Sequence, residues 1–253
     1  MFALERQKRI LENLNTDGAV TVSKLSAELG VTEETVRRDL EKLESKELLR
    51  RTHGGALPID EGSYEFSLEK RKSINVEIKQ ALARKAVQYI ASGDSVFLDA
   101  STTTFYMAKE IKNMKNVTVI TNSIRIINEL SGVEGIKVIA TGGMVSNNQS
   151  FVGSMAENQI TEKYFADKMF FSSRGIGDNS IILESNEQEC FIKQRMMKNS
   201  RTHFYLCDKS KIGRVGYMRL ASFDEIDYLV IDTDVTGDLK DILDEYNVEI
   251  VKV

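Results

Sequence analysis

Apolar residues near the amino end of the chain recur with the 3.6-residue period of an α-helix. Val22, Leu25 and Leu29 stand at positions i, i+3 and i+7, so they fall on one helical face. Thr21 is placed to cap this helix with its hydroxyl, and Gly30 follows as a residue that readily ends one. The pattern predicts a helix of about two turns followed by a tight turn.

A second amphipathic helix is expected directly after the turn, from Glu33 to Lys46. Val36, Leu40 and Leu43 recur at i, i+4 and i+7, and Thr32 offers a capping hydroxyl. Two helices joined by a turn of three or four residues that contains Gly form a helix-turn-helix, whose second helix lies in the DNA major groove. An arginine there that contacts guanine O6 and N7 with two N–H groups contributes roughly 1–3 kcal/mol of discrimination.

A short hairpin is expected after the second helix. Leu48 to Thr52 has the composition of a strand, His53 to Gly55 that of a turn, and Ala56 and Leu57 that of a return strand. Such a hairpin is a wing, whose side chains suit phosphate contacts that position a protein without reading sequence. The candidate DNA contacts of the helices and the wing are Thr21, Thr32, Glu34, Thr35, Arg37, Arg38, Arg50, Arg51, Thr52 and His53.

The charge of this segment does not by itself favour DNA binding. Residues 1–57 hold ten Lys and Arg against ten Asp and Glu, so their net charge is zero. Nucleic-acid-binding domains are usually basic. Helix pairs with a Gly between them also occur in many all-helical domains, where exposed arginines only solvate a face. The DNA-binding interpretation therefore depends on the detailed sequence of the two helices and the wing.

The apolar pattern divides the chain into two domains. A helix from Leu4 to Leu14 completes a three-helix unit, which with the wing fills residues 1–57. The stretch from Pro58 to Ser63 breaks the pattern, and we expect a linker over residues 58–74. A larger second domain is expected over residues 75–253.

Strand and helix patterns alternate through this second domain, beginning with a helix from Asn75 to Ile90. The expected strands are Val96–Leu98, Val117–Ile120, Lys137–Ala140, Met169–Phe171, Phe204–Cys207, Leu229–Ile231 and Ile250–Val251. The expected helices lie near Thr103–Ile111, Ser123–Leu130, Ser154–Tyr164, Glu187–Asn199 and Leu239–Tyr246. Alternation of this kind predicts the α/β class, with a mostly parallel sheet covered on both faces.

Polar residues gather where the expected strands end, and ligands of parallel sheets bind at those carboxyl ends. Asp99 to Thr104 places hydroxyls at a helix start, where free backbone N–H groups favour an anion. Thr121 to Ser123, Thr141 to Gly143, Ser172 to Gly175 and Asp208 to Lys211 follow later strands. Any one of these loops is explained by helix capping alone. Several loops converging on one sheet edge predict a pocket for a small phosphorylated polyol or sugar.

Composition excludes several other classes of protein. The 253 residues include 42% hydrophobic residues and carry a net charge of −4, which fits a folded protein that does not coat nucleic acid non-specifically. No apolar run is long enough to cross a membrane, and we expect a cytoplasmic protein. Cys190 and Cys207 are isolated, as are His53 and His203, so we expect neither a disulfide nor a metal site and no cofactor.

The sequence resembles a known family in both domains. The runs TVRRDL at residues 35–40 and RTHGGA at residues 51–56 are similar to the N-terminal winged helix-turn-helix of DeoR-type bacterial transcription regulators. The segments LDASTTT, VITNS, ATGG, SFVG and DKSK resemble the sensor domain of the same family, which is similar in fold to ribose-5-phosphate isomerase. One departure is Ala100-Ser101, where the family pattern usually has Ser-Gly.

This resemblance implies a phosphosugar effector and the repression of sugar-utilisation operons. It also implies a role for particular residues of the second domain. The phosphate loop would be Ser101, Thr102 and Thr103, and the rest of the effector pocket would be lined by Asp99, Thr121, Asn122, Gly142, Gly143 and Lys209.

Three functions remain open at this stage. The first is a repressor that binds double-stranded operator DNA as a homodimer or homotetramer, because paired half-sites require paired helices, and that is relieved by a phosphorylated sugar. The second is an aldose–ketose phosphate isomerase or deaminase, for which Asp99, Glu187 or Glu189 offers a base and Lys193 or Lys209 a cation. The third is a constitutive DNA-binding protein whose pocket has decayed. The helix-turn-helix and its wing favour the regulator over the enzyme.

Overall fold

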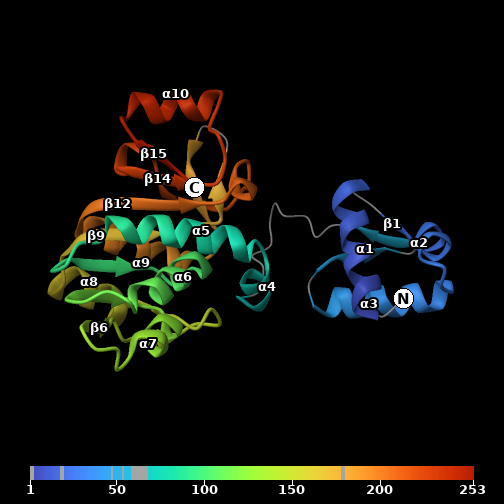
Figure 1. The fold of residues 1–253 in the computed structure, drawn as a ribbon, viewed down its shortest axis with the longest axis horizontal. Helices are drawn as coiled ribbons and strands as arrows, with labels where there is room; N and C mark the ends of the chain where they lie inside the picture. Colours follow the sequence, from blue (N-terminus) through green and yellow to red (C-terminus); the bar gives the residue numbers. More distant parts are fainter. Residues whose placement is uncertain (1–2, 18–19, 47, 53, 58–67, 178–179) are drawn as a thin grey trace. The chain divides into compact units, whose positions relative to one another are not determined.

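A computed structural model describes residues 3–17, 20–46, 48–52, 54–57, 68–177 and 180–253. The chain divides into two compact units, of which the first ends at Arg71 and the second runs from Lys72 to Val253. Each unit, drawn as a ribbon in Figure 1, has a hydrophobic core of its own.

The first unit contains the expected three helices. They are α1 (Ala3–Asp17), α2 (Val22–Leu29) and α3 (Glu33–Ser45). Gly30 ends α2 in the left-handed conformation, with φ of 64°. Ile10, Val36 and Leu40 are fully buried between the helices, because the apolar positions of α1 and α3 face a common core. The helical period read from the sequence is thus confirmed.

The wing is the hairpin of β2 (Arg50–Thr52) and β3 (Gly55–Leu57), extended by a strand that the sequence pattern did not reveal. This additional strand is β1 (Val20–Thr21), which pairs antiparallel with β3 to give the order β1-β3-β2. A Cβ on Gly55 would lie 1.9 Å from the carbonyl oxygen of Val20, so only glycine allows the two strands to approach this closely.

The second unit is built on a seven-stranded sheet in which every neighbouring pair is parallel. Its order is β15-β14-β12-β9-β4-β5-β6. The strands are β4 (Ser95–Leu98), β5 (Val117–Thr121), β6 (Ile136–Ala140), β9 (Ala166–Phe171), β12 (Ser200–Cys207), β14 (Tyr228–Ile231) and β15 (Glu249–Lys252). All seven expected strands are present, and the expectation of a mostly parallel α/β sheet is confirmed.

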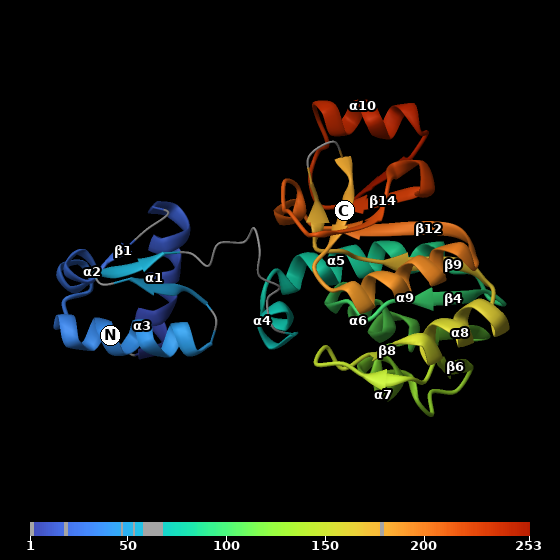
Figure 2. The same ribbon diagram turned by 180° about the vertical axis from the view of Figure 1, so that it is seen from behind.

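Helices cover both faces of this sheet, as Figures 1 and 2 show from opposite sides. One face is packed by α5 (Val76–Ala86), α6 (Thr102–Ile111) and α7 (Ile124–Leu130). The other is packed by α8 (Ser154–Lys163), α9 (Glu187–Lys198) and α10 (Asp238–Glu245). The helix α4 (Leu68–Ser73) precedes α5. A 3-10 turn, η1 (Val87–Tyr89), follows α5 directly.

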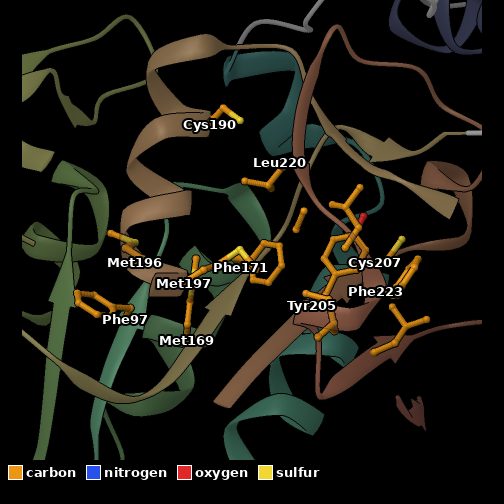
Figure 3. Packing of buried hydrophobic residues seen from close by; sticks show 14 of the residues in the cluster. Phe97, Met169, Phe171, Cys190, Met196, Met197, Tyr205, Cys207, Leu220 and Phe223 are labelled. Carbon is orange, nitrogen blue, oxygen red and sulfur yellow. The ribbon is translucent and has the colours of Figure 1, made fainter. Parts of the chain in front are cut away.

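Aromatic residues of the central strands fill the core on the α9 face. The rings of Phe171 and Tyr205 stack with centroids 5.2 Å apart, and Phe223 lies 6.4 Å beyond Tyr205 (Figure 3). Met196 and Met197 of α9 are buried in the same cluster. This core holds β9 and β12 side by side, and therefore fixes the loops that leave their carboxyl ends.

Two small antiparallel sheets were not expected from the sequence. One pairs β7 (Met144–Val145) with β8 (Phe151–Val152), and the other joins β10 (Gly175–Ile176), β11 (Ile182–Glu184) and β13 (Met218–Ala221). These strands have two to four residues, too few for an alternating pattern to be recognised. None of the described helices has the length and apolarity needed to cross a membrane.

Candidate functional site

The exposed face of α3 carries the arginines expected to meet DNA. Thr32 caps the helix, accepting a hydrogen bond from the backbone N–H of Thr35 at 3.3 Å. Arg37 and Arg38 are exposed on the turn that follows. Each pairs with the glutamate four residues before it, at 2.7 Å for Arg37 with Glu33 and 3.4 Å for Arg38 with Glu34. Exposed pairs of this kind contribute about 0.3–0.5 kcal/mol, so they are easily exchanged for contacts to DNA.

Asp39, in the middle of the TVRRDL run, points away from these arginines. It is 2% exposed, and its carboxylate binds the guanidinium Nε of Arg6 and, at 3.1 Å, the amide of Gln7. These bonds fix α1 against α3. Asp39 therefore acts on the exposed face only by holding the helix that carries it.

The wing presents further basic residues. Arg50, Arg51 and Thr52 are exposed on β2, and the backbone N–H of Arg51 donates to Glu44 of α3 at 2.9 Å. Thr21 caps α2 by accepting from the N–H of Lys24 at 3.3 Å and is also exposed. His53, which was expected to contact DNA, lies outside the described residues.

In the second unit, Asp99 is the centre of the polar residues at the carboxyl ends of the strands. Its side chain is completely buried after β4. Oδ1 accepts from the N–H of Ser101 at 3.1 Å and from the Thr104 hydroxyl at 2.8 Å. Oδ2 accepts from the N–H of Ser172 at 3.2 Å and lies 3.3 Å from Lys193 Nζ. Asp99 thus joins the loops after β4 and β9 to α9.

The expected phosphate loop forms the start of α6. Ser101 caps the helix by accepting from the N–H of Thr104 at 3.2 Å, and Thr102 and Thr103 are buried in the first turn. The first N–H groups of a helix have no acceptor within it, and the helix dipole favours negative charge at this end. The loop therefore has the chemistry of an anion site.

Thr121 and Asn122 follow β5 but differ in what their side chains can offer a ligand. The Thr121 hydroxyl donates to the carbonyl of Leu98 at 2.6 Å, which commits it to the backbone. Asn122 donates from Nδ2 to Phe151 O at 3.2 Å and to Glu189 at 3.3 Å. Its Oδ1 is buried without a hydrogen-bond partner in the described part of the chain. Asn122 therefore has an acceptor available.

The two glycines after β6 have different reasons for being glycine. Both have positive φ, 66° for Gly142 and 123° for Gly143. A Cβ on Gly143 would lie 2.9 Å from Val152 O and 3.0 Å from the Ala156 side chain, so this position is closed by packing. A Cβ on Gly142 would meet nothing within 4 Å. Of the two, Gly142 has the open surroundings that a ligand requires.

A buried group of charges from β11 and α9 completes the site. Lys193 Nζ binds Glu184 and donates to the carbonyl of Ser172 at 2.8 Å, in addition to its contact with Asp99. Burial lowers the pKa of Lys193, but Glu184 and Asp99 outweigh burial and raise it above its ordinary value. Lys193 is therefore a charged, fully paired cation. The sequence offered Lys193 only as the possible cation of an isomerase, and it gave no indication of Glu184.

Besides Lys193, α9 contributes the carboxyl group of Glu189 to the site. It binds the Ser150 hydroxyl and Asn122, and it is 5% exposed. Burial raises its pKa, and the opposing effects of Ser150 and Lys193 are too small to restore the ordinary value. Ser150 opens the SFVG segment, but the sequence did not assign it to the pocket, because it lies beside strands of two residues each.

The structure separates the two lysines of the DKSK segment. The Lys209 side chain, expected in the pocket, is exposed, and among the hydrogen bonds of the described residues Lys209 donates only from its backbone N–H, to Asp232 at 2.6 Å. Lys211 instead reaches inward: its Nζ donates to the Ser172 hydroxyl and, at 2.8 Å, to Ser173 O. Burial lowers the pKa of Lys211, which the charge of Asp208 partly opposes.

The described residues contain no group of three or more His, Cys, Asp or Glu side chains arranged to hold a metal ion. Cys190 and Cys207 are free and buried, and burial raises their pKa values to about 11 and about 12. Neither thiol is therefore a reactive thiolate near neutral pH.

Family models match both units. One described as the DeoR-like helix-turn-helix domain matches residues 6–61, and one described as the DeoR C terminal sensor domain matches residues 74–233. The uncharacterized HTH-type transcriptional regulator YulB of Bacillus subtilis is 39% identical over 254 residues, covering 100% of this chain and 98% of that protein.

Two further relatives are named as repressors. The HTH-type transcriptional repressor GlcR of Bacillus subtilis is 32% identical over 252 residues, covering 99% of this chain and 96% of that protein. The lactose phosphotransferase system repressor of Streptococcus mutans is 34% identical over 232 residues, covering 90% and 91%.

Among solved structures, ribose 5-phosphate isomerase A from Methanocaldococcus jannaschii is similar with a TM-score of 0.42 and 15% identity, covering 55% of each chain. The eIF2B beta subunit from Chaetomium thermophilum is similar with a TM-score of 0.41 and 15% identity, covering 87% of this chain and 61% of that one. No conclusion about activity follows from similarities this distant.

Proposed function

The chain belongs to the DeoR family of transcription regulators, and on that premise we propose that it represses a sugar-utilisation operon until a phosphorylated sugar releases it from operator DNA. It is a DNA-binding regulator and not an enzyme. We expect it to work in the cytoplasm, where its operator lies.

The DNA-reading part of this proposal assigns roles to residues of the first unit. Thr35, Arg37 and Arg38 would contact base edges, because they project from the early turns of α3. Arg50 and Arg51 of the wing would contact phosphates. The remaining proposed contacts are Thr21, Thr32, Glu34, Thr52 and His53. Paired half-sites require paired recognition helices, so we propose a homodimer or homotetramer.

The effector part rests on one observation: the start of α6, with its first-turn N–H groups, adjoins the buried polar residues around Asp99. A phosphate suits the helix start. Sugar hydroxyls suit Asn122, whose Oδ1 lacks a partner in the described residues, and the open backbone at Gly142. The proposed pocket residues are Asp99, Ser101, Thr102, Thr103, Thr121, Asn122, Gly142, Gly143 and Lys209, and we add Lys211 because its ammonium group binds Ser172 and Ser173.

Thermal-shift screening of the full chain against hexose, pentose and triose phosphates tests the effector part. A sugar phosphate at a hundred times its dissociation constant should stabilise the protein by about 2.7 kcal/mol. The matching unphosphorylated sugars are the control, and they should give no shift. If no phosphorylated sugar raises the melting temperature, the pocket assigned here does not bind this class of ligand.

A further inference from the structure

Asn75 makes a side-chain connection that its position at the start of α5 does not require. Asparagine before a helix normally caps that helix, yet the Asn75 side chain makes no capping bond. Its Nδ2 donates instead to Asp208 Oδ1 and to Ser210 Oγ, both at 3.1 Å. The residue also has φ of 52°, a left-handed conformation that asparagine tolerates better than most residues. The side chain of Asn75 thus binds the loop after β12 in place of capping α5.

That loop is the same short turn that carries Lys211 into the proposed effector site. The turn is η3 (Lys209–Lys211), capped by Asp208, whose Oδ1 accepts from the N–H of Ser210 at 3.1 Å. The N–H of Lys211 donates to the carbonyl of Asp208 at 2.9 Å. Asp208 therefore cannot move far without moving Lys211, and the reverse also holds.

A second attachment strengthens the start of α5. Lys79 is 5% exposed, and its Nζ donates to the carbonyl of Ile74 at 2.8 Å, which closes the chain back on itself around Asn75. Burial alone raises the pKa of Asp208, but Lys211, Ser210, Lys79 and Asn75 together outweigh burial and lower it. The ionised Asp208 is thus held from both sides, by the effector-site turn and by the first turn of α5.

The position of Asn75 in the chain gives this connection a consequence. The second unit begins at Lys72, so the polypeptide that leads from the DNA-binding unit enters α5 through residues 72–76. An anion bound in the proposed effector site would compete with Ser172 and Ser173 for the ammonium group of Lys211. A shift of Lys211 carries Asp208 with it, and Asn75 with Asp208.

We propose that Asn75 is a positioning residue that transmits the state of the effector site to the chain entering the second unit. The proposal rests on the proposed function, since it assigns the regulatory route of that site. An effector acts only through its different affinity for two arrangements of the protein. The bonds from Asn75 to Asp208 and Ser210 are what differ between those two arrangements.

Hydrogen–deuterium exchange of the full chain tests the connection without any ligand or DNA. The probe is Lys211→Met, which changes the effector-site end of the turn, and the readout is amide exchange across residues 74–80. Lys211→Met should change this exchange several-fold in the otherwise unchanged protein. In an Asn75→Gly background, which keeps the left-handed backbone and removes only the side chain, it should have no effect.

A matched control lies at the amino end of a strand, just before β5, away from the carboxyl ends that form the effector site. Asn116 is also left-handed, with φ of 60°, and its Nδ2 donates to Ser92 Oγ at 3.2 Å. In an Asn116→Gly background the effect of Lys211→Met should persist.

An equal response in the Asn75→Gly background, or none in the otherwise unchanged protein, would overturn the proposal. A purely structural Asn75 would raise exchange in Asn75→Gly itself but leave the response to Lys211→Met intact. If Lys211→Met does not fold, Lys211→Gln replaces it as the probe. The experiment contains no sugar phosphate and no DNA. Its result therefore does not depend on whether the protein binds a sugar phosphate, and the two proposals can fail independently.

Discussion

Lys193 Nζ lies 3.3 Å from Asp99 Oδ2, and both side chains are buried beneath the carboxyl ends of the central strands. The same ammonium group binds Glu184, so one cation balances two buried carboxylates. Removing one partner of a buried pair leaves an uncompensated charge in a region of low dielectric. The stability of the second unit therefore depends on Lys193.

Lys193→Met should destabilise the second unit by about 3–5 kcal/mol, because it strands Asp99 and Glu184 without a counter-charge. Urea unfolding followed by circular dichroism measures this loss. Lys240→Met, which breaks the exposed pair of α10 with Asp244, is the control and should change stability by less than about 1 kcal/mol. Equal effects of the two substitutions would show that the buried group contributes no more than a surface pair.

Glu189→Gln should stabilise the protein, and the gain should increase with pH. Burial raises the pKa of Glu189 above its ordinary value of 4.5, so the folded state holds this proton at pH values where the unfolded chain has released it. The stabilising contribution of the carboxyl group is complete below pH 4.5 and is lost as the pH rises through the folded pKa. Glutamine cannot ionise and avoids this loss.

Urea unfolding of Glu189→Gln and of the unchanged protein at pH 5 and pH 8 measures the difference. The gain should be larger at the higher pH, provided that the glutamine oxygen accepts from Asn122 while its NH2 group donates to the Ser150 hydroxyl, which reverses the bond that Ser150 makes to Glu189. A gain that is independent of pH would mean that Glu189 has the same pKa in the folded and unfolded states.

Asp39→Asn should loosen the first unit, because it removes the buried negative charge that pairs with the half-buried guanidinium of Arg6. The expected cost is about 3 kcal/mol, which is roughly a hundredfold faster amide exchange in α1 and α3. Exchange in the second unit serves as the internal control and should not change. Undiminished protection of α3 would mean that the Arg6 contact is unimportant for the fold of this unit.

Substituting an arginine of the recognition helix should change DNA binding differently from substituting an arginine of the wing. Arg37→Ala should relax discrimination at one base position by about 1–3 kcal/mol. Arg50→Ala should weaken binding to all sequences alike and reduce the salt dependence by about one counterion. Titration of DNA selected from a random pool, at several salt concentrations, separates the two effects. If Arg37→Ala binds every sequence with unchanged preference, that arginine does not read bases.

Much of the fold is encoded in local patterns that the sequence displays. Thr21 and Thr32 cap the helices that their positions predicted, and the apolar runs of β4 and β5 mark buried strands correctly. Element ends are less visible: β12 begins at Ser200, ahead of the apolar run at Phe204, because its first residues are polar. Pairing with β9 extends the strand beyond what its own composition indicates.

The candidate site is less predictable, because its members are distant in sequence. Glu184 lies in a strand of three residues, and only the fold brings it to Lys193. In the DKSK segment both lysines have the same chemistry. A single 3-10 turn decides that Lys211 points inward and Lys209 outward, and no property of the sequence distinguishes them.

A sugar phosphate bound to the second unit should control how tightly the first unit binds DNA. This control is measured by titrating operator fragments, selected by the full-length protein, with and without the sugar phosphate that raises its melting temperature. We expect tight, sequence-specific binding that the sugar phosphate weakens, while the unphosphorylated sugar has no effect. Operator affinity that is unchanged by a sugar phosphate shown to bind the protein would mean that the effector does not regulate DNA binding.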